Sequence, residues 1–199
     1  MVEVRIKTHL WIRWARVAVR QEKRAKEMRS IYLASNDSHE KAVLMGWESD
    51  EAIVGISAVA FALDGLYGDL QGVIAIPQTG KNRGRRRGKV YETLKRSTSQ
   101  TQLASTWHEQ ITRLYSLRDQ AVHHVPKFSS LVMHPIGDTS TSPEGAEYTA
   151  EELDNSVDLL LTILESVVKQ PSRAAQQWAT TVGGTVGKLR EMRLTGEGF

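Results

Sequence analysis

The sequence contains no cysteine among its 199 residues. Disulfide bonds, thiolate metal sites and cysteine nucleophiles are therefore excluded as explanations of what the chain does. The absence is compatible with a reducing compartment, where disulfides are rare. Apolar residues make up 40% of the chain and charged residues 25%, which is the composition of a folded globular protein rather than a disordered one.

The sequence also lacks an uninterrupted apolar run of membrane-spanning length. The longest run covers residues 52–63 and is broken by Gly55 and Ser57, whereas a membrane helix needs about 20 apolar residues. The first residues alternate apolar and basic side chains, without the apolar core and cleavage site of a signal peptide. We therefore expect a cytoplasmic protein with no membrane partner.

Several catalytic and binding motifs are missing as well. Gly80-Lys81 lacks the first glycine and the hydroxyl residue of a phosphate-binding loop, and no serine has a nucleophile-elbow context. Four histidines lie outside any zinc-ligand spacing: His9, His39, His108 and His134. We expect no metal and no cofactor.

Apolar residues recur at three- and four-residue spacing through most of the chain, which is typical of amphipathic helices. Only residues 73–76 resemble a strand. The pattern predicts an all-α fold, a helical bundle of about four to six helices. The predicted helices cover residues 9–33, 39–67, 98–122 and 149–170, with a short one ending near Arg193.

The predicted organisation is one bundle with additions at both ends. Residues 37–170 form the bundle, residues 1–36 a basic amphipathic helix packed on it, and residues 171–199 a C-terminal extension. Asp37 or Ser38 is expected to cap the second helix, and Thr149, with Glu152 three residues on, to cap the helix that follows the 126–147 loop.

Positive charge is concentrated in two blocks although the net charge is only +3. Residues 1–36 carry nine Lys and Arg against three acids, and residues 81–96 carry eight against one. Such blocks can present a face that binds polyanions, while a solvated surface is the plainer interpretation. Residues 77–88 are predicted to form a flexible Arg-rich loop, either a nucleic-acid-binding arm or a solubilising loop. The candidate nucleic-acid-binding residues are Lys81, Arg83, Arg85, Arg86, Arg87 and Lys89.

Arg118 lies in the apolar sector of its predicted helix when the helix is phased at about 100° per residue. A buried guanidinium without a partner is very unfavourable, so Arg118 either pairs with Asp64 or Asp119, or faces an interface or cleft. His124 lies at the edge of the apolar stripe. The helix ends near His123, because Pro126 disfavours helical geometry before it, and phasing does not fix the direction of His123.

The segment Arg118-Asp119-Gln120-Ala121-Val122-His123 resembles the R-x4–6-H motif of HEPN domains, which carry it at the end of a helix. Residues 58–64 are similar to the family's second helix, with small residues and an acid, and the helix from Glu152 follows where the family places its last one. The resemblance covers residues 39–170. It implies a four- or five-helix bundle that dimerises, with two motifs brought together at the interface.

Many HEPN proteins are metal-independent endoribonucleases, so the resemblance implies an RNA substrate and products with 2′,3′-cyclic phosphate ends. In that role His123 transfers protons, Arg118 stabilises the phosphate and Asp119 orients one of them, since imidazole titrates near neutral pH and guanidinium binds phosphate bidentately. His124 also has a spacing within the family range and is an alternative to His123. A toxin or defence effector held in check by an antitoxin protein is one expectation.

Two other interpretations stay open. Arg118 and His123 are also compatible with cations that cap a helix C-terminus. The family includes members without nuclease activity, so a non-catalytic dimerisation or nucleic-acid-binding module is the alternative.

Overall fold

The computed structural model describes residues 9–75, 86–123, 130–135 and 140–196. Its architecture confirms the predicted all-α bundle. The helices are α1 (Leu10–Ala34), α2 (Ser38–Leu70), α3 (Arg86–Ser97), α4 (Thr101–Val122), α5 (Pro143–Glu147), α6 (Ala150–Lys169) and α7 (Gln176–Thr195), with a 3₁₀ turn at Arg173–Ala175. Two short strands, β1 (Val132–Met133) and β2 (Ser140–Thr141), pair in antiparallel fashion.

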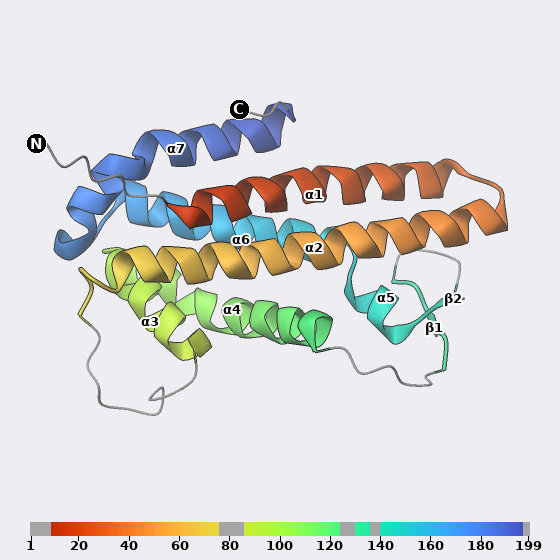
Figure 1. Ribbon diagram of the computed structural model, residues 1–199, viewed down its shortest axis with the longest axis horizontal. Helices are drawn as coiled ribbons and strands as arrows, with labels where there is room; N and C mark the ends of the chain where they lie inside the picture. The colour runs from red at the N-terminus through yellow and green to blue at the C-terminus, as the bar shows by residue number, and fades with distance from the viewer. Residues whose placement is uncertain (1–8, 76–85, 124–129, 136–139, 197–199) are drawn as a thin grey trace, which may run out of the picture.

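The longest helices lie nearly parallel along the molecule (Figure 1). α1 and α2 form an antiparallel hairpin, and α6 runs behind them. α7 packs against α1 and α6 on one side, whereas α3 and α4 pack against α2 on the other. α2 therefore lies at the centre of the bundle, in contact with α1, α3, α4 and α6.

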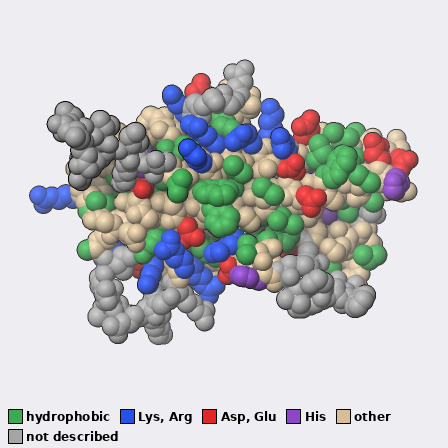
Figure 2. All heavy atoms as spheres, in the orientation of Figure 1, with side chains coloured by type: hydrophobic (Ala, Val, Ile, Leu, Met, Phe, Trp, Pro, Cys, Tyr) green, Lys and Arg blue, Asp and Glu red, His purple; other side chains and the backbone are tan. Residues whose placement is uncertain are grey.

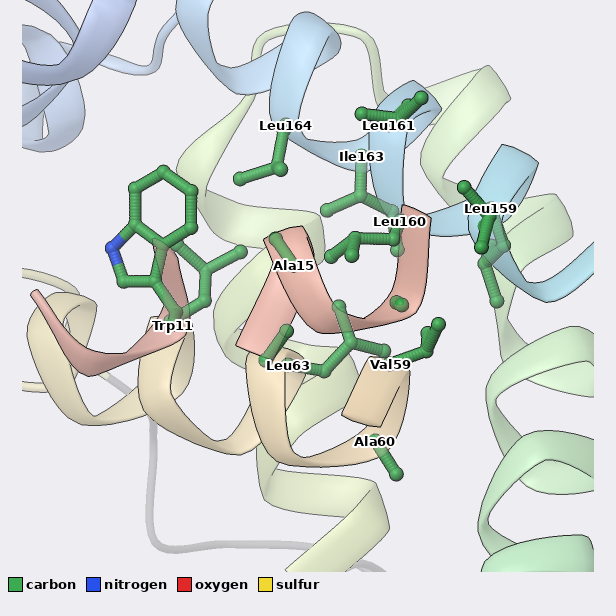
Figure 3. Close-up of a cluster of buried hydrophobic side chains, with 14 of the residues drawn as sticks. Trp11, Ala15, Val59, Ala60, Leu63, Leu159, Leu160, Leu161, Ile163 and Leu164 are labelled. Carbon is green, nitrogen blue, oxygen red and sulfur yellow. The ribbon is translucent and has the colours of Figure 1, made fainter. Parts of the chain in front are cut away.

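The core is built where α1, α2 and α6 meet (Figure 3). α2 contributes small residues such as Ala60 and larger ones such as Leu63, both fully buried, which agrees with the apolar run seen in the sequence. Trp11 of α1 and Leu160 of α6 are fully buried in the same cluster. Small residues on α2 let its neighbours approach closely, and this fixes the position of α2 relative to the other helices.

By length and composition alone, α2 could cross a membrane, and it is the one such helix among the described residues. More than half of its most apolar window is buried inside the bundle. The same composition is found in the core helix of a bundle, so this is weak evidence for a membrane segment.

Both predicted helix caps are confirmed. The Asp37 carboxylate accepts hydrogen bonds from the backbone N–H groups of His39 and Glu40, at 2.7 and 3.0 Å. The Thr149 hydroxyl accepts one from the Glu152 N–H at 3.2 Å. These bonds satisfy donors that a helix start leaves free, and they set where α2 and α6 begin.

The structure differs from the sequence prediction at four places. The described part of the predicted 126–147 loop contains the β1–β2 pair and helix α5, because backbone groups of this segment pair with one another. Residues 86–88 belong to α3, so the Arg-rich loop predicted over 77–88 is too long at that end, and residues 77–85 lie outside the described residues. Of the strand-like segment 73–76, residues 73 and 74 lie in a turn and a bend and residue 75 in no strand, while residue 76 lies outside the described residues. Beyond Pro171, α7 is a long helix packed on the bundle, because Trp178, Val182 and Leu189 are buried against it.

The close approach of α1 and α2 predicts opposite effects for two glycine substitutions. A Cβ at Gly65 would lie 3.1 Å from both the Cβ and the backbone nitrogen of Trp11, whereas a Cβ at Gly46 meets nothing within 4 Å. We expect Gly65→Ala to lower the free energy of unfolding by about 1–2 kcal/mol. Gly46→Ala should raise it by about 0.5–1 kcal/mol, since alanine favours a helix interior. Urea unfolding measures both, and a stabilising Gly65→Ala would contradict the close α1–α2 contact.

Candidate functional site

The motif segment occupies the end of α4, as predicted. α4 ends at Val122, and the backbone N–H of His123 donates to the Asp119 carbonyl at 2.9 Å. The buried hydroxyl of Tyr148 donates to the Leu117 carbonyl at 2.7 Å, which ties this last turn to the segment leading into α6. The end of α4 is therefore held by both its own backbone and a neighbouring element.

Arg118 is four-fifths buried, with 20% of its side chain exposed. Its Nε lies 3.3 Å from Asp119 Oδ1, and its guanidinium lies 5.1 Å from the centre of the Tyr115 ring. The Nε atom is buried and makes no hydrogen bond to the described residues. Of the two partners that the sequence suggested, Asp119 is thus the direct one, and it leaves hydrogen-bonding capacity on the guanidinium unused.

The other predicted partner, Asp64 of α2, reaches Arg118 through Tyr115. The Tyr115 hydroxyl donates to Asp64 Oδ1 at 3.0 Å. Burial raises the pKa of Tyr115 strongly, and the nearby Asp64 charge raises this pKa further, while Arg118 and Arg86 oppose both effects. Tyr115 is therefore a neutral phenol that holds Asp64 on one side and presents its ring to Arg118 on the other.

Arg86, the first residue of α3, is the direct ionic partner of Asp64. Its Nε donates to Asp64 Oδ1 at 2.7 Å, and its guanidinium lies 4.3 Å from the centre of the Tyr67 ring. Half of the Arg86 side chain remains exposed. This residue was predicted as part of a nucleic-acid-binding loop, and in the structure it anchors the start of α3 to α2.

These contacts form a continuous chain from Arg86 through Asp64 and Tyr115 to Arg118. The chain holds two guanidinium groups and the Asp64 carboxylate, and with Asp119 the formal charges are equal. Because 58% of the Asp119 side chain is exposed to solvent, its ion pair with Arg118 is weak. The arrangement suits an anion such as a phosphate group, which would complete the hydrogen bonding of Arg118.

The histidine half of the motif is exposed and less constrained. His123 is exposed, and its side chain makes no hydrogen bond, ion pair or ring stacking with a described residue, Arg118 included. His124 lies outside the described residues. Within the part of one chain that the structure describes, no hydrogen bond or ring interaction therefore joins Arg118 to His123.

Of the other basic residues singled out in the sequence, Arg87 and Lys89 lie on α3 and form no ion pair with described residues. Lys89 is exposed and Arg87 partly so. Figure 2 shows Lys and Arg side chains gathered below α2, where α3 lies. Lys81, Arg83 and Arg85 fall outside the described residues. No group of three histidine or acidic residues in the described ranges could hold a metal ion.

Sequence reasoning missed Tyr115, Tyr67 and the pairing role of Arg86. Tyr115 precedes Arg118 by three residues, a spacing that places two helical side chains on one face, and this was the available signal. The contact between Arg86 and Asp64 joins residues that are 22 positions apart in the sequence, and no periodicity encodes it.

Comparisons of this chain with protein-family models, with curated proteins and with solved structures return no match.

Proposed function

We propose that the protein is a metal-independent endoribonuclease of the HEPN type, with Arg118 and His123 as its catalytic residues. The observation that carries the proposal is the Arg118 guanidinium, which is largely buried, flanked by an aromatic ring and left with an unused Nε–H. A buried cation retained in this way, at the helix-end position of the R-x4–6-H motif, is suited to stabilising charge that develops on a phosphate.

In this mechanism the 2′-hydroxyl of the RNA attacks the adjacent phosphorus. The His123 imidazole accepts the 2′-hydroxyl proton or donates a proton to the departing 5′-oxygen, and water carries the other proton, because an imidazole can serve as either base or acid. Arg118 balances the extra negative charge on the phosphorane oxygens. The P–O5′ bond breaks, and the products carry a 2′,3′-cyclic phosphate and a 5′-hydroxyl. Asp119 orients Arg118, and His124 is the alternative proton carrier.

The site is proposed to be completed by a second copy of the chain. No hydrogen bond or ring interaction joins Arg118 to His123 in the described part of one protomer, and the exposed position of His123 leaves it available to a partner. A homodimer with the α4 ends at its interface would bring two arginines and two histidines together. In a toxin or defence setting, an antitoxin protein covering this interface would hold the enzyme inactive.

The second candidate is a helical nucleic-acid-binding module without chemistry. Lys89 and Arg87, which are not neutralised by described acids, favour it, because unpaired cations on one helix suit a phosphate backbone. This candidate needs no histidine and predicts binding that weakens steeply with salt and leaves the RNA intact.

The test is to incubate the purified protein with a structured RNA in excess EDTA, beside the double variant Arg118→Ala/His123→Ala. We expect the wild-type protein to produce fragments with cyclic phosphate ends, which mass spectrometry identifies, and the double variant to produce none. His39→Ala is the matched control, since His39 is an exposed histidine at the start of α2, far along the bundle from the motif.

Cleavage that survives in the double variant would overturn the site, and cleavage abolished by EDTA would overturn the metal-independent mechanism. If the RNA stays intact but binds in a salt-sensitive way, and binding is lost on Arg87→Gln/Lys89→Gln, the second candidate is the correct one.

A further inference from the structure

A second basic site lies at the opposite end of α4 from Arg118. An open hollow of about 490 Å³ is bordered by the end of α3, the start of α4 and the turn that precedes α7. Its lining includes three cationic side chains, Lys95, Arg96 and Arg173, against a single acid, Glu92. The distance from Thr101 to Arg118 along α4 is about 25 Å, so this hollow is separate from the proposed catalytic site.

The backbone around the hollow is rigidly held. Thr98 and Pro171 form an isolated antiparallel bridge, and the Ser172 N–H donates to the Ser97 carbonyl at 2.8 Å. The Thr98 hydroxyl lies 2.9 Å from the Gln170 carbonyl and is within reach of Ser166 as well. These bonds fix the start of α4 and the segment before α7 at the same end of the bundle, on the left in Figure 1.

The charges that face the hollow are only partly neutralised. Arg96 lies 3.6 Å from Glu92 on the same helix, and both are partly exposed, so the pairing is weak. Lys95 lies over the Tyr91 ring, at 5.7 Å from its centre, and has no ion pair with the described residues. Arg173 is exposed and has no acidic partner in the described ranges either. Net positive charge therefore remains in the hollow.

The first turn of α4 borders the hollow at Thr101, and Ser172 belongs to its lining. Gln100, the N-cap of α4, makes no side-chain capping bond, because its amide oxygen accepts from the Ser166 hydroxyl instead, and the N–H groups of Gln102 and Leu103 belong to the uncapped first turn. Independently, the buried side-chain oxygen of Ser172, which lines the hollow, has no hydrogen-bond partner among the described residues. A buried hydroxyl without a partner is unfavourable unless a ligand satisfies it.

We propose that this hollow binds a phosphate group. A tetrahedral phosphate accepts several hydrogen bonds at once, so the Arg173 guanidinium, the Lys95 ammonium, the Ser172 hydroxyl and the first-turn amides of α4 can each donate to a different oxygen. A phosphate dianion also matches the excess of positive charge. The phosphate can belong to a polynucleotide, to a mononucleotide or to free phosphate, and this proposal does not depend on the proposed RNA cleavage.

The experiment follows backbone amide shifts by NMR in the full chain during titration with inorganic phosphate, at constant ionic strength set with chloride. We expect saturable shifts at Gln102, Leu103, Arg173 and Ala174, and a dissociation constant raised at least about tenfold by Lys95→Gln/Arg173→Gln. The matched control, Arg13→Gln/Arg20→Gln, removes two exposed cations from α1 and should leave the constant unchanged.

Ser172→Ala separates a binding role from a structural one. It should weaken phosphate binding several-fold while leaving the ligand-free midpoint of thermal unfolding unchanged or raised, since it removes an unsatisfied hydroxyl. A lower midpoint with unchanged phosphate binding would show that the hydroxyl serves the fold and would remove it from the site.

Parallel titrations with a 5′-mononucleotide and with a 2′-O-methyl RNA oligomer identify the source of the phosphate. The probe that saturates the shifts of the same four amides at the lowest concentration shows which kind of molecule carries the bound phosphate. Absence of saturable shifts at these amides with all three probes would overturn the proposal. Equal weakening of phosphate binding by the two double variants would overturn it as well.

Discussion

Replacing Arg118 with alanine is expected to lower the rate of RNA cleavage by about 10²–10³-fold or more, because one preorganised cation is removed from the developing phosphorane charge. The largest part of the loss should appear in kcat rather than in KM, since most of the RNA affinity comes from other basic residues. Single-turnover cleavage of a labelled RNA, with enzyme in excess, measures the chemical step directly.

Arg118→Lys sharpens this prediction. Lysine keeps the positive charge but loses the planar fork that binds two phosphate oxygens and the stacking on the Tyr115 ring, so it should restore only a small part of the rate. Arg113 supplies the matched control, since it lies on the same helix and pairs with Glu152 at 2.7 Å. Loss of activity in Arg113→Lys equal to that in Arg118→Lys would mean that helix stability, not phosphate contact, underlies the effect.

The long helices could be predicted because their apolar faces repeat with the helical period and their ends carry recognisable caps. The segment predicted over residues 149–170 is α6 at Ala150–Lys169, with Thr149 as its cap. The segment predicted over 9–33 is α1 at Leu10–Ala34. In both cases periodicity and termination signals are local, and tertiary packing then reinforces the same choice.

α3 and α7 show why the remainder could not be predicted. The first turn of α3 is rich in Arg and Gly, a composition that favours a loop, and the helix is held there by the contact of Arg86 with Asp64 and Tyr67. α7 contains Gly183, Gly184 and Gly187, which lower helix propensity, yet it remains helical because it packs on α1 and α6. Such contacts between distant residues leave no mark in a local pattern.

For the candidate site, the sequence predicted that Arg118 needs a partner and named Asp119, which pairs with it directly, and Asp64, which is linked to it through Tyr115. It could not rank them, because the mediating position of Tyr115 depends on how α2 and α4 pack. The position of His123 also could not be predicted, since helical phasing stops having meaning where the helix ends. The structure identifies Asp119 as the direct partner of Arg118. The placement of His123 next to an Arg118 side chain is part of the proposed dimer.

The attachment of α7 to the bundle rests on a partly buried ionic network centred on Arg193. The Arg193 Nε donates to both carboxylate oxygens of Glu22 on α1, at 3.0 and 2.9 Å, and another nitrogen donates to Asp154 Oδ1 on α6 at 2.7 Å. Asp158 and Lys26 complete the network. Burial raises the pKa of Glu22, and a hydrogen bond that its protonated form donates to Asp154 raises it further, whereas Arg193 and Lys26 lower it, so Glu22 depends on these cations to stay ionised.

Arg193→Met is therefore expected to lower the free energy of unfolding by about 3 kcal/mol, since it leaves the Glu22 carboxylate, with only 3% of its side chain exposed, short of its main counter-charge. The loss should lie at the low end for a broken buried pair, because Lys26 still contacts Glu22 at 2.7 Å. Arg190→Met is the matched control on the same helix. Arg190 is half-exposed and lies 3.5 Å from Glu165, so its loss should change stability by less than about 0.5 kcal/mol.

A second substitution identifies the cause of that destabilisation. If the buried carboxylate is responsible, Glu22→Gln introduced into Arg193→Met should recover part of the lost stability, because a neutral amide is less unfavourable to bury than an unpaired charge. Urea unfolding at neutral pH, followed by circular dichroism, gives all four corners of the cycle. Losses that simply add would mean that Arg193 acts through Asp154 and Asp158 or through packing of its aliphatic stem. In that case the anchor of α7 would be its contact with α6 rather than with the N-terminal helix.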